Sequence, residues 1–192
     1  RYFKEKNSSH QPLYMFIHGL MCSFVLLVKM NLIVFWIFPL LAVFISILIS
    51  KDYKNLFRNI LAYIAGLVTI IIPVILYFIC NNALSEAWNT YVILNKNYVN
   101  MGTYSETIEN LIVRLYQRFR FEAFEYIIIL LGVFLFPLKY ISNKLGKIAI
   151  ILSFICLHII IFMSPNYVYY YSIPYYVFSS LGCIVIMNWL AK

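Results

Sequence analysis

Long apolar stretches with few or no charged residues constrain this chain more than any other feature of its sequence. A helix needs about 20 predominantly apolar residues to cross the hydrocarbon core of a bilayer, because its backbone must satisfy its own hydrogen bonds there. The fourth stretch is extended at both ends from the shorter charge-free run 126–138. The pattern predicts six membrane-spanning helices, at residues 12–28, 30–50, 59–85, 121–140, 147–163 and 173–190.

The overall composition supports lipid as the solvent. The chain is 64% hydrophobic and only 11% charged, with a mean hydropathy of +0.85. Soluble domains are about 45–50% apolar and about 25% charged, and a small domain has too much surface to hide a larger excess. We therefore predict an all-α polytopic transmembrane helix bundle that forms a single domain over residues 1–192, with membrane lipid as its partner.

Two prolines shape the expected spans. Pro73 lies inside the third stretch, where we expect a kink that neighbouring helices in a membrane can tolerate. Residues 148–191 are charge-free for too long to form one helix, and the sequence Ser164-Pro165-Asn166 is expected to divide them. The chain opens on Arg1 rather than Met and shows no signal-peptide cleavage pattern, which we interpret as a piece of a longer protein.

The charges between the stretches predict the orientation. Flanks 1–11, 51–58, 139–147 and 191–192 together hold ten basic and two acidic residues, whereas the remaining flanks hold five of each sign. Lys and Arg concentrate in short cytoplasmic loops, so these four flanks and both termini are predicted to be cytoplasmic. A nucleic-acid partner is disfavoured despite the net charge of +8, because the basic residues are not pooled in one patch.

The outer segment 81–124 is too patterned to be a plain linker. Thr103 and Glu106 have the spacing of a capping box, and the apolar residues that follow recur at helical spacing. These apolar residues are Ile108, Leu111, Ile112, Leu115 and Phe119. We predict an amphipathic helix over 104–119 in the outer membrane interface, and a second short helix from Leu84 to Asn97 anchored by Trp88 and Tyr91.

Signatures of soluble enzymes and of metal sites are absent from the sequence. It has no P-loop, G-x-G-x-x-G, H-E-x-x-H or G-x-S-x-G motif, and its four cysteines are isolated packing residues without ligand spacing. No metal site is therefore expected in this chain. His18 and His158 fall inside predicted spans, where a histidine is either a packed polar group or a functional one.

Several loose motifs occur in a suggestive order over residues 20–190. They are the helix Gly19–Asn31 with Lys29 near its end, the basic turn Lys51–Arg58, the span segment Gly66–Pro73, the Asn82-Ala83-Leu84 exit, the pair Asn97-Tyr98, and the run Tyr169–Pro174. This layout resembles the later half of bacterial polytopic glycosyltransferases of the GT-C type, and is similar to dolichyl-phosphate-mannose protein mannosyltransferases and the aminoarabinose transferase of lipid A.

The resemblance implies transfer of a sugar from a polyprenyl-phosphate donor to an acceptor on the outer side of a bacterial inner membrane. Fixed cations near a phosphate leaving group lower the barrier by stabilising the charge that develops there. The residues implied for binding the lipid phosphate or substrate are Lys29, Arg114, Arg118, Tyr170 and Tyr171. Each also has a simpler interpretation: a snorkelling lysine, arginines on lipid headgroups, and tyrosines of an aromatic belt.

Two departures from the family pattern matter. Tyr170 stands where the family often has the histidine of a His-Tyr pair. The family's catalytic acid is an Asp of an outer loop, but the only Asp of this chain, Asp52, lies in a predicted cytoplasmic turn. We therefore expect no catalytic residue and no cofactor within this chain. The catalytic acid, together with any divalent metal, is expected in a part of the protein that precedes Arg1.

Other functions remain open at this point. A surface polysaccharide polymerase or ligase would share the lipid-linked donor and the long outer loop. A transporter or permease subunit is disfavoured, because transporters carry paired interrupted spans and intramembrane ionisable groups. A membrane scaffold without an active site is a third alternative.

Overall fold

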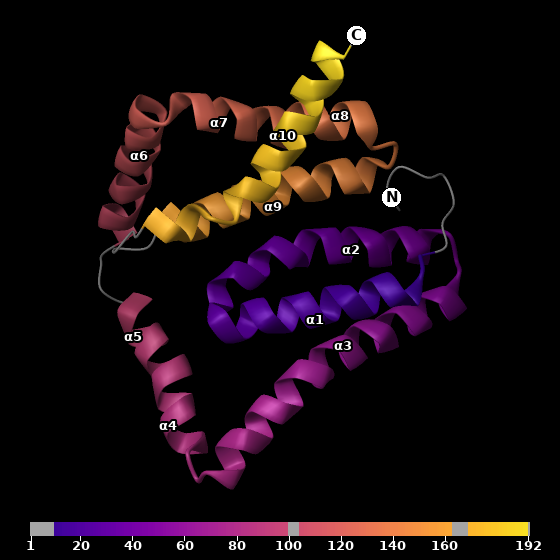
Figure 1. The fold of residues 1–192 in the computed structure, drawn as a ribbon, viewed down its shortest axis with the longest axis vertical. Helices are drawn as coiled ribbons and strands as arrows, with labels where there is room; N and C mark the ends of the chain where they lie inside the picture. The colour runs from indigo at the N-terminus through magenta and orange to yellow at the C-terminus, as the bar shows by residue number, and fades with distance from the viewer. Residues whose placement is uncertain (1–9, 100–103, 163–168, 192) are drawn as a thin grey trace.

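The computed structural model describes residues 10–99, 104–162 and 169–191, and within these residues all regular structure is helical. Figure 1 shows the helices as a bundle of elongated rods, with α4, α5 and α6 crossing one end of it. The main helices are α1 (Pro12–Val28), α2 (Val34–Ile49), α3 (Tyr53–Cys80), α6 (Tyr104–Phe121), α7 (Ala123–Leu130), α9 (Lys144–Phe162) and α10 (Tyr175–Leu190). The shorter helical segments are η1 (Met30–Ile33), α4 (Leu84–Trp88), η2 (Asn89–Ile93), α5 (Leu94–Val99), η3 (Leu131–Leu135), α8 (Phe136–Tyr140) and η4 (Tyr169–Ser172).

The predicted spans correspond to apolar helices in the described part of the chain. Four helical stretches are long and apolar enough to cross a bilayer: Met30–Ile49, Tyr53–Cys80, Ala123–Tyr140 and Lys144–Phe162. Two shorter apolar helices, Pro12–Val28 and Tyr175–Leu190, occupy the first and sixth predicted positions. The all-α class and the character of an integral membrane protein are thereby confirmed. The expected break at residues 164–166 lies outside the described residues.

The bounds of α3 differ from the predicted span 59–85 at both ends. The helix begins at Tyr53 because the Asp52 side chain caps it, accepting a hydrogen bond from the backbone N–H of Asn55 at 3.1 Å. It continues through Pro73 and ends at Cys80, and Asn82 then adopts a positive φ of 51°. Asparagine tolerates this left-handed conformation better than most residues, so the chain turns there and a new helix starts at Leu84.

The fourth span is a continuous helical stretch with a wider turn in its middle. Residues Leu131–Leu135 adopt π-helical geometry between α7 and α8. Pro137 lies two residues after this segment and has no backbone N–H to donate to the carbonyl of Val133. A π-turn is a common way for a helix to accommodate such a local irregularity.

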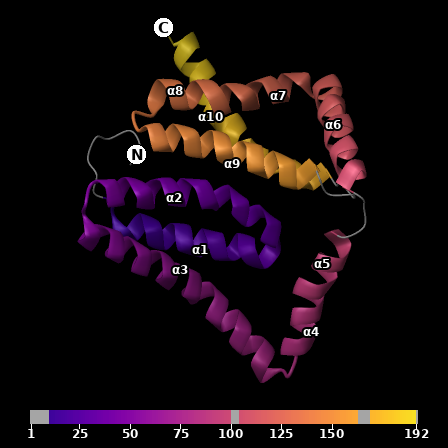
Figure 2. The ribbon, with the colours of Figure 1, turned by 180° about the vertical axis from the view of Figure 1, so that it is seen from behind.

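The bundle consists of two parallel helix pairs joined by an antiparallel pair. α1 packs along α3, and α10 packs along α7 and η3, with both members of each pair running in the same direction (Figure 1). Between them, α2 packs on α9 in the opposite direction, so that Ser46 bonds Asn143 at 2.9 Å and Phe35 accepts a 3.4 Å hydrogen bond from Ser153. The same layers are visible from behind in Figure 2.

Each parallel pair crosses where two glycines meet. An added Cβ on Gly19 would lie 3.1 Å from the Cα of Gly66, and a Cβ on Gly132 would lie 2.7 Å from the backbone nitrogen of Gly182. Real Cβ atoms essentially never come as close as the second of these contacts, so glycine is required for the helices to approach. Small residues at helix crossings are the usual means of close packing in a membrane.

Polar contacts gather the predicted cytoplasmic flanks at one end of the bundle. The His10 imidazole Nδ1 lies 2.9 Å from the Asn59 side-chain oxygen, and the His10 backbone exchanges hydrogen bonds with Asn55. The bond from Asn143 to Ser46 brings the α8–α9 turn to the end where α2 finishes. The starts of α1 and α3 and the turn before α9 therefore lie at the same end, as the charge pattern predicts.

Enlarging a glycine at the second crossing tests this architecture. We expect Gly182→Leu to lower the free energy of unfolding by roughly 1–3 kcal/mol, the usual cost of overpacking, because the new side chain would meet the Ile128 backbone. Cys183→Leu, on the exposed neighbouring position, is the matched control and should leave stability nearly unchanged. Equilibrium unfolding in mixed micelles measures both; equal stability of the two variants would contradict the close crossing.

Candidate functional site

Lys29 lies at the turn between α1 and α2, at the end of the bundle away from His10. Its backbone N–H closes the last turn of α1 by donating to the Val25 carbonyl at 2.8 Å, and its own φ of −158° is extended. The chain therefore leaves α1 at Lys29 before η1 begins at Met30. The half-buried lysine therefore lies in the turn between two apolar helices, one before it and one after it in the sequence.

Tyr171 is the residue that the fold brings to Lys29. It belongs to η4, which leads into α10, and its ring lies with its centroid 2.7 Å from the Lys29 ammonium nitrogen. An ammonium over an aromatic face is attracted by the electron-rich ring, more strongly when water is excluded. Burial lowers the pKa of Lys29 to about 8, since a low-polarity environment disfavours the charged form. Below that pH most of the lysine is protonated, so the site is cationic at pH 7.

A buried cluster around His158 holds the segment that carries Tyr171. Tyr175 is fully buried, and its hydroxyl lies 2.8 Å from Nδ1 of His158 on α9. The Tyr126 hydroxyl of α7 lies 3.3 Å from both ring nitrogens of the same histidine. The rings of Phe154 and Phe162, one turn before and after His158 on α9, flank its imidazole with centroids 5.4 and 4.6 Å away. The start of α10 is thus fixed to two other helices.

Tyr171 packs against the same apolar core as this cluster. The core includes Tyr126, Phe162 and Tyr175, and Tyr171 and Leu111 are among the partly buried side chains that cover it. The sequence identified His158 as packed or functional, but nothing in it indicated the two tyrosines. Phe154 and Phe162 lie four residues before and after His158, so all three share one face of a helix. This spacing was the available sequence signal that the histidine is buried.

Helix α6 brings Arg114 to the same end of the molecule. The residues 104–119, predicted to form an amphipathic helix, lie within α6, which extends to Phe121. Leu111 packs against the core that also contacts Tyr171, and the Phe119 ring lies 4.8 Å from that of Tyr126, which is a close edge-on aromatic contact. Arg114 is half-buried on this helix.

The remaining predictions concern Arg118, Tyr170 and the second short helix. The side chains of Arg118 and Tyr170 lie outside the described part of the structure. The second short helix expected from Leu84 to Asn97 is present as the continuous segment α4–η2–α5, which extends to Val99, and Trp88 on it is 60% exposed. Lys29 and Tyr171 are therefore the pair of predicted site residues for which the structure shows direct contact.

Lys29 gives this candidate site a positive charge. Among these residues no group of three or more His, Cys, Asp or Glu side chains is placed to hold a metal ion. Comparison of the chain with protein-family models, with curated proteins and with solved structures gives no match. The candidate site consists of a half-buried ammonium on an aromatic face at the end of an apolar bundle.

The lowered pKa of Lys29 predicts unusual amine reactivity. Only the neutral amine reacts with an acylating reagent, so the rate at Lys29 should reach half its maximum near pH 8 rather than near the ordinary value of 10.5. Mass spectrometry of peptides after brief labelling over a pH series measures this, with a lysine in a free peptide as the reference. A midpoint at the ordinary value would show that water fully solvates the ammonium.

Proposed function

We propose that this chain is the lipid-donor-binding part of a membrane glycosyltransferase that uses a polyprenyl-phosphate-linked sugar. The contact of the Lys29 ammonium with Tyr171 is the observation that carries the proposal. It supplies a positive charge at one end of an apolar bundle, where the phosphate of a membrane-embedded donor would lie in the proposed topology. An intramembrane or interfacial cation is costly unless it reaches water, headgroups or an anion, which makes such a residue a functional candidate.

The proposed topology has six spans, with the His10 end in the cytoplasm and the Lys29 end outside. It is supported by six apolar helices at the predicted positions and by the excess of basic residues in the flanks at the His10 end. α6 runs across the direction of α7 and α9 in both views (Figures 1 and 2), as a helix lying in the outer interface would. Its Arg114 would then be at headgroup level, where it can add a second positive charge.

The chemistry follows from the charge that forms during transfer. When the sugar leaves, the lipid phosphate gains negative charge, and a cation already in position stabilises it without reorganising. The aromatic face of Tyr171 holds the ammonium in place before the donor arrives. Tyr170 and Arg118 remain proposed contributors from the same segments. A polysaccharide polymerase or ligase would use the same donor contact, so the acceptor distinguishes the two functions.

Removing the charge at Lys29 tests the donor site. We expect Lys29→Ala and Lys29→Met to weaken binding of a polyprenyl phosphate by about tenfold or more, since a hydrogen bond to a charged group is worth roughly 1.5–3 kcal/mol. Sugar transfer by the protein that carries the catalytic acid should fall by about 10²-fold. Binding is measured by native mass spectrometry of the purified chain titrated with the lipid.

The matched control is Lys96→Ala, an exposed lysine on α5 that the charge pattern assigns to the same side of the membrane. It should leave lipid binding unchanged. If Lys29→Ala binds the lipid as tightly as the unaltered chain, Lys29 is a snorkelling anchor and the donor-site proposal fails.

A further inference from the structure

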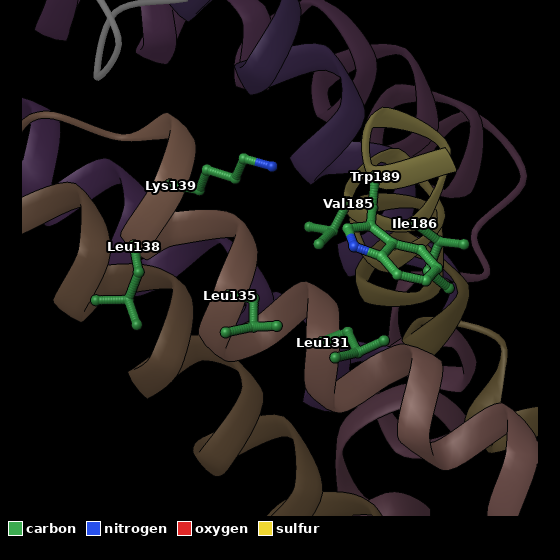
Figure 3. A pocket seen from close by; sticks show the side chains of 7 residues that line it. All are labelled: Leu131, Leu135, Leu138, Lys139, Val185, Ile186 and Trp189. Atoms are coloured by element: carbon green, nitrogen blue, oxygen red, sulfur yellow. The ribbon is translucent and has the colours of Figure 1, made fainter. Parts of the chain in front are cut away.

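A groove of about 530 Å³ opens between α8 and the end of α10, away from Lys29. Leu131, Leu135 and Leu138 line one side of it, and Val185 and Trp189 line the other (Figure 3). Lys139 is the charged residue in its lining, and its side chain extends toward α10 in the same view. The volume lies within the range of small-molecule sites, roughly 300–1,000 Å³.

The groove is a consequence of how the two helices cross. They touch at Gly132 and Gly182, run in the same direction, and separate beyond this point. α10 therefore packs closely on α7 and η3 but only slightly on α8. Leu131 directly precedes Gly132, and the other lining residues follow the crossing glycines in sequence, which places them where the helices have separated. Leu135 and Leu138 are accordingly 45% and 65% exposed although they are flanked by a neighbouring helix.

The lining matches one kind of membrane molecule. Its apolar wall is suited to an acyl chain, because a leucine-lined slot facing lipid loses nothing by contacting hydrocarbon. The Lys139 ammonium is exposed, with its nitrogen 5.3 Å from the Tyr140 ring centroid, and is therefore accessible to a phosphate. Trp189 is 72% exposed on the opposite helix, and an indole N–H is typical of residues at the lipid headgroup level.

The location provides charge complementarity. Lys139 stands in the flank 139–147, which carries three lysines and no acidic residue. This flank lies at the end of the bundle where α2 finishes, as the bond from Asn143 to Ser46 shows. Basic pockets between membrane helices are recognised sites for anionic lipid headgroups.

We propose that this groove binds one anionic glycerophospholipid, with an acyl chain between α8 and α10 and its phosphate on Lys139. The site is separate from the Lys29–Tyr171 contact, and it stands or falls independently of the proposed transferase function. It assigns to α10 a lipid-binding role in addition to its packing on α7.

Quenching of Trp189 by brominated lipids tests the proposal in bilayer nanodiscs. Trp36→Phe and Trp88→Phe together leave Trp189 as the remaining tryptophan of the three in the chain. We expect phosphatidylglycerol with brominated chains to quench Trp189 at about fivefold lower mole fraction than phosphatidylcholine with the same chains, the size expected for one lysine near an anionic headgroup. Lys139→Gln should abolish this preference, so that both lipids quench Trp189 at about the same mole fraction.

Two further variants identify the source of any preference. Lys144→Gln removes an exposed lysine of the same flank that does not line the groove, and it should keep the fivefold preference. Leu135→Phe narrows the groove and should weaken quenching by both lipids. Equal quenching by the two lipids before any change at Lys139 would overturn the proposal, and so would an equal loss in Lys144→Gln and Lys139→Gln. No effect of Leu135→Phe would place the lipid outside the groove.

Discussion

Direct backbone contact between helices at two glycine pairs organises this bundle. Within a bilayer, burial of apolar surface does not drive helices together, because lipid tails are as apolar as leucine side chains. Close van der Waals contact must supply the attraction, and Gly19 with Gly66 and Gly132 with Gly182 allow it. At the first crossing the Ser23 hydroxyl also donates to the Leu67 carbonyl at 3.0 Å, so a polar bond reinforces the contact.

The same two crossings determine what lies at the ends of the bundle. Helices that touch at one point and run in the same direction must separate beyond it, which leaves the groove beside Lys139. At the other end, α10 starts from a segment that His158 fixes through the Tyr175 hydroxyl, and this segment presents Tyr171 to Lys29. The two candidate binding sites thus lie at opposite ends of the same bundle, and each includes a lysine.

Much of the fold followed from the sequence, and the departures have local physical causes. The first helix was predicted with the observed bounds Pro12–Val28, because its apolar run ends at a charged residue. The start of α3 was wrong because the Asp52 cap stabilises a turn that contains Lys54 and Arg58, which hydropathy counts against a span. The family resemblance grouped Lys29 with Tyr171 in one site, whereas nothing in the sequence indicated the two tyrosines on His158.

The sequence by itself determined that this protein lies in lipid and where along the chain its helices occur. These properties are local, since the cost of placing each residue in hydrocarbon depends on its own side chain and near neighbours. Only the tertiary structure decided which helices pair, that Tyr171 meets Lys29, and that a groove opens beside Lys139. These features depend on contacts between residues far apart in the chain, and periodicity and composition carry no information about such contacts.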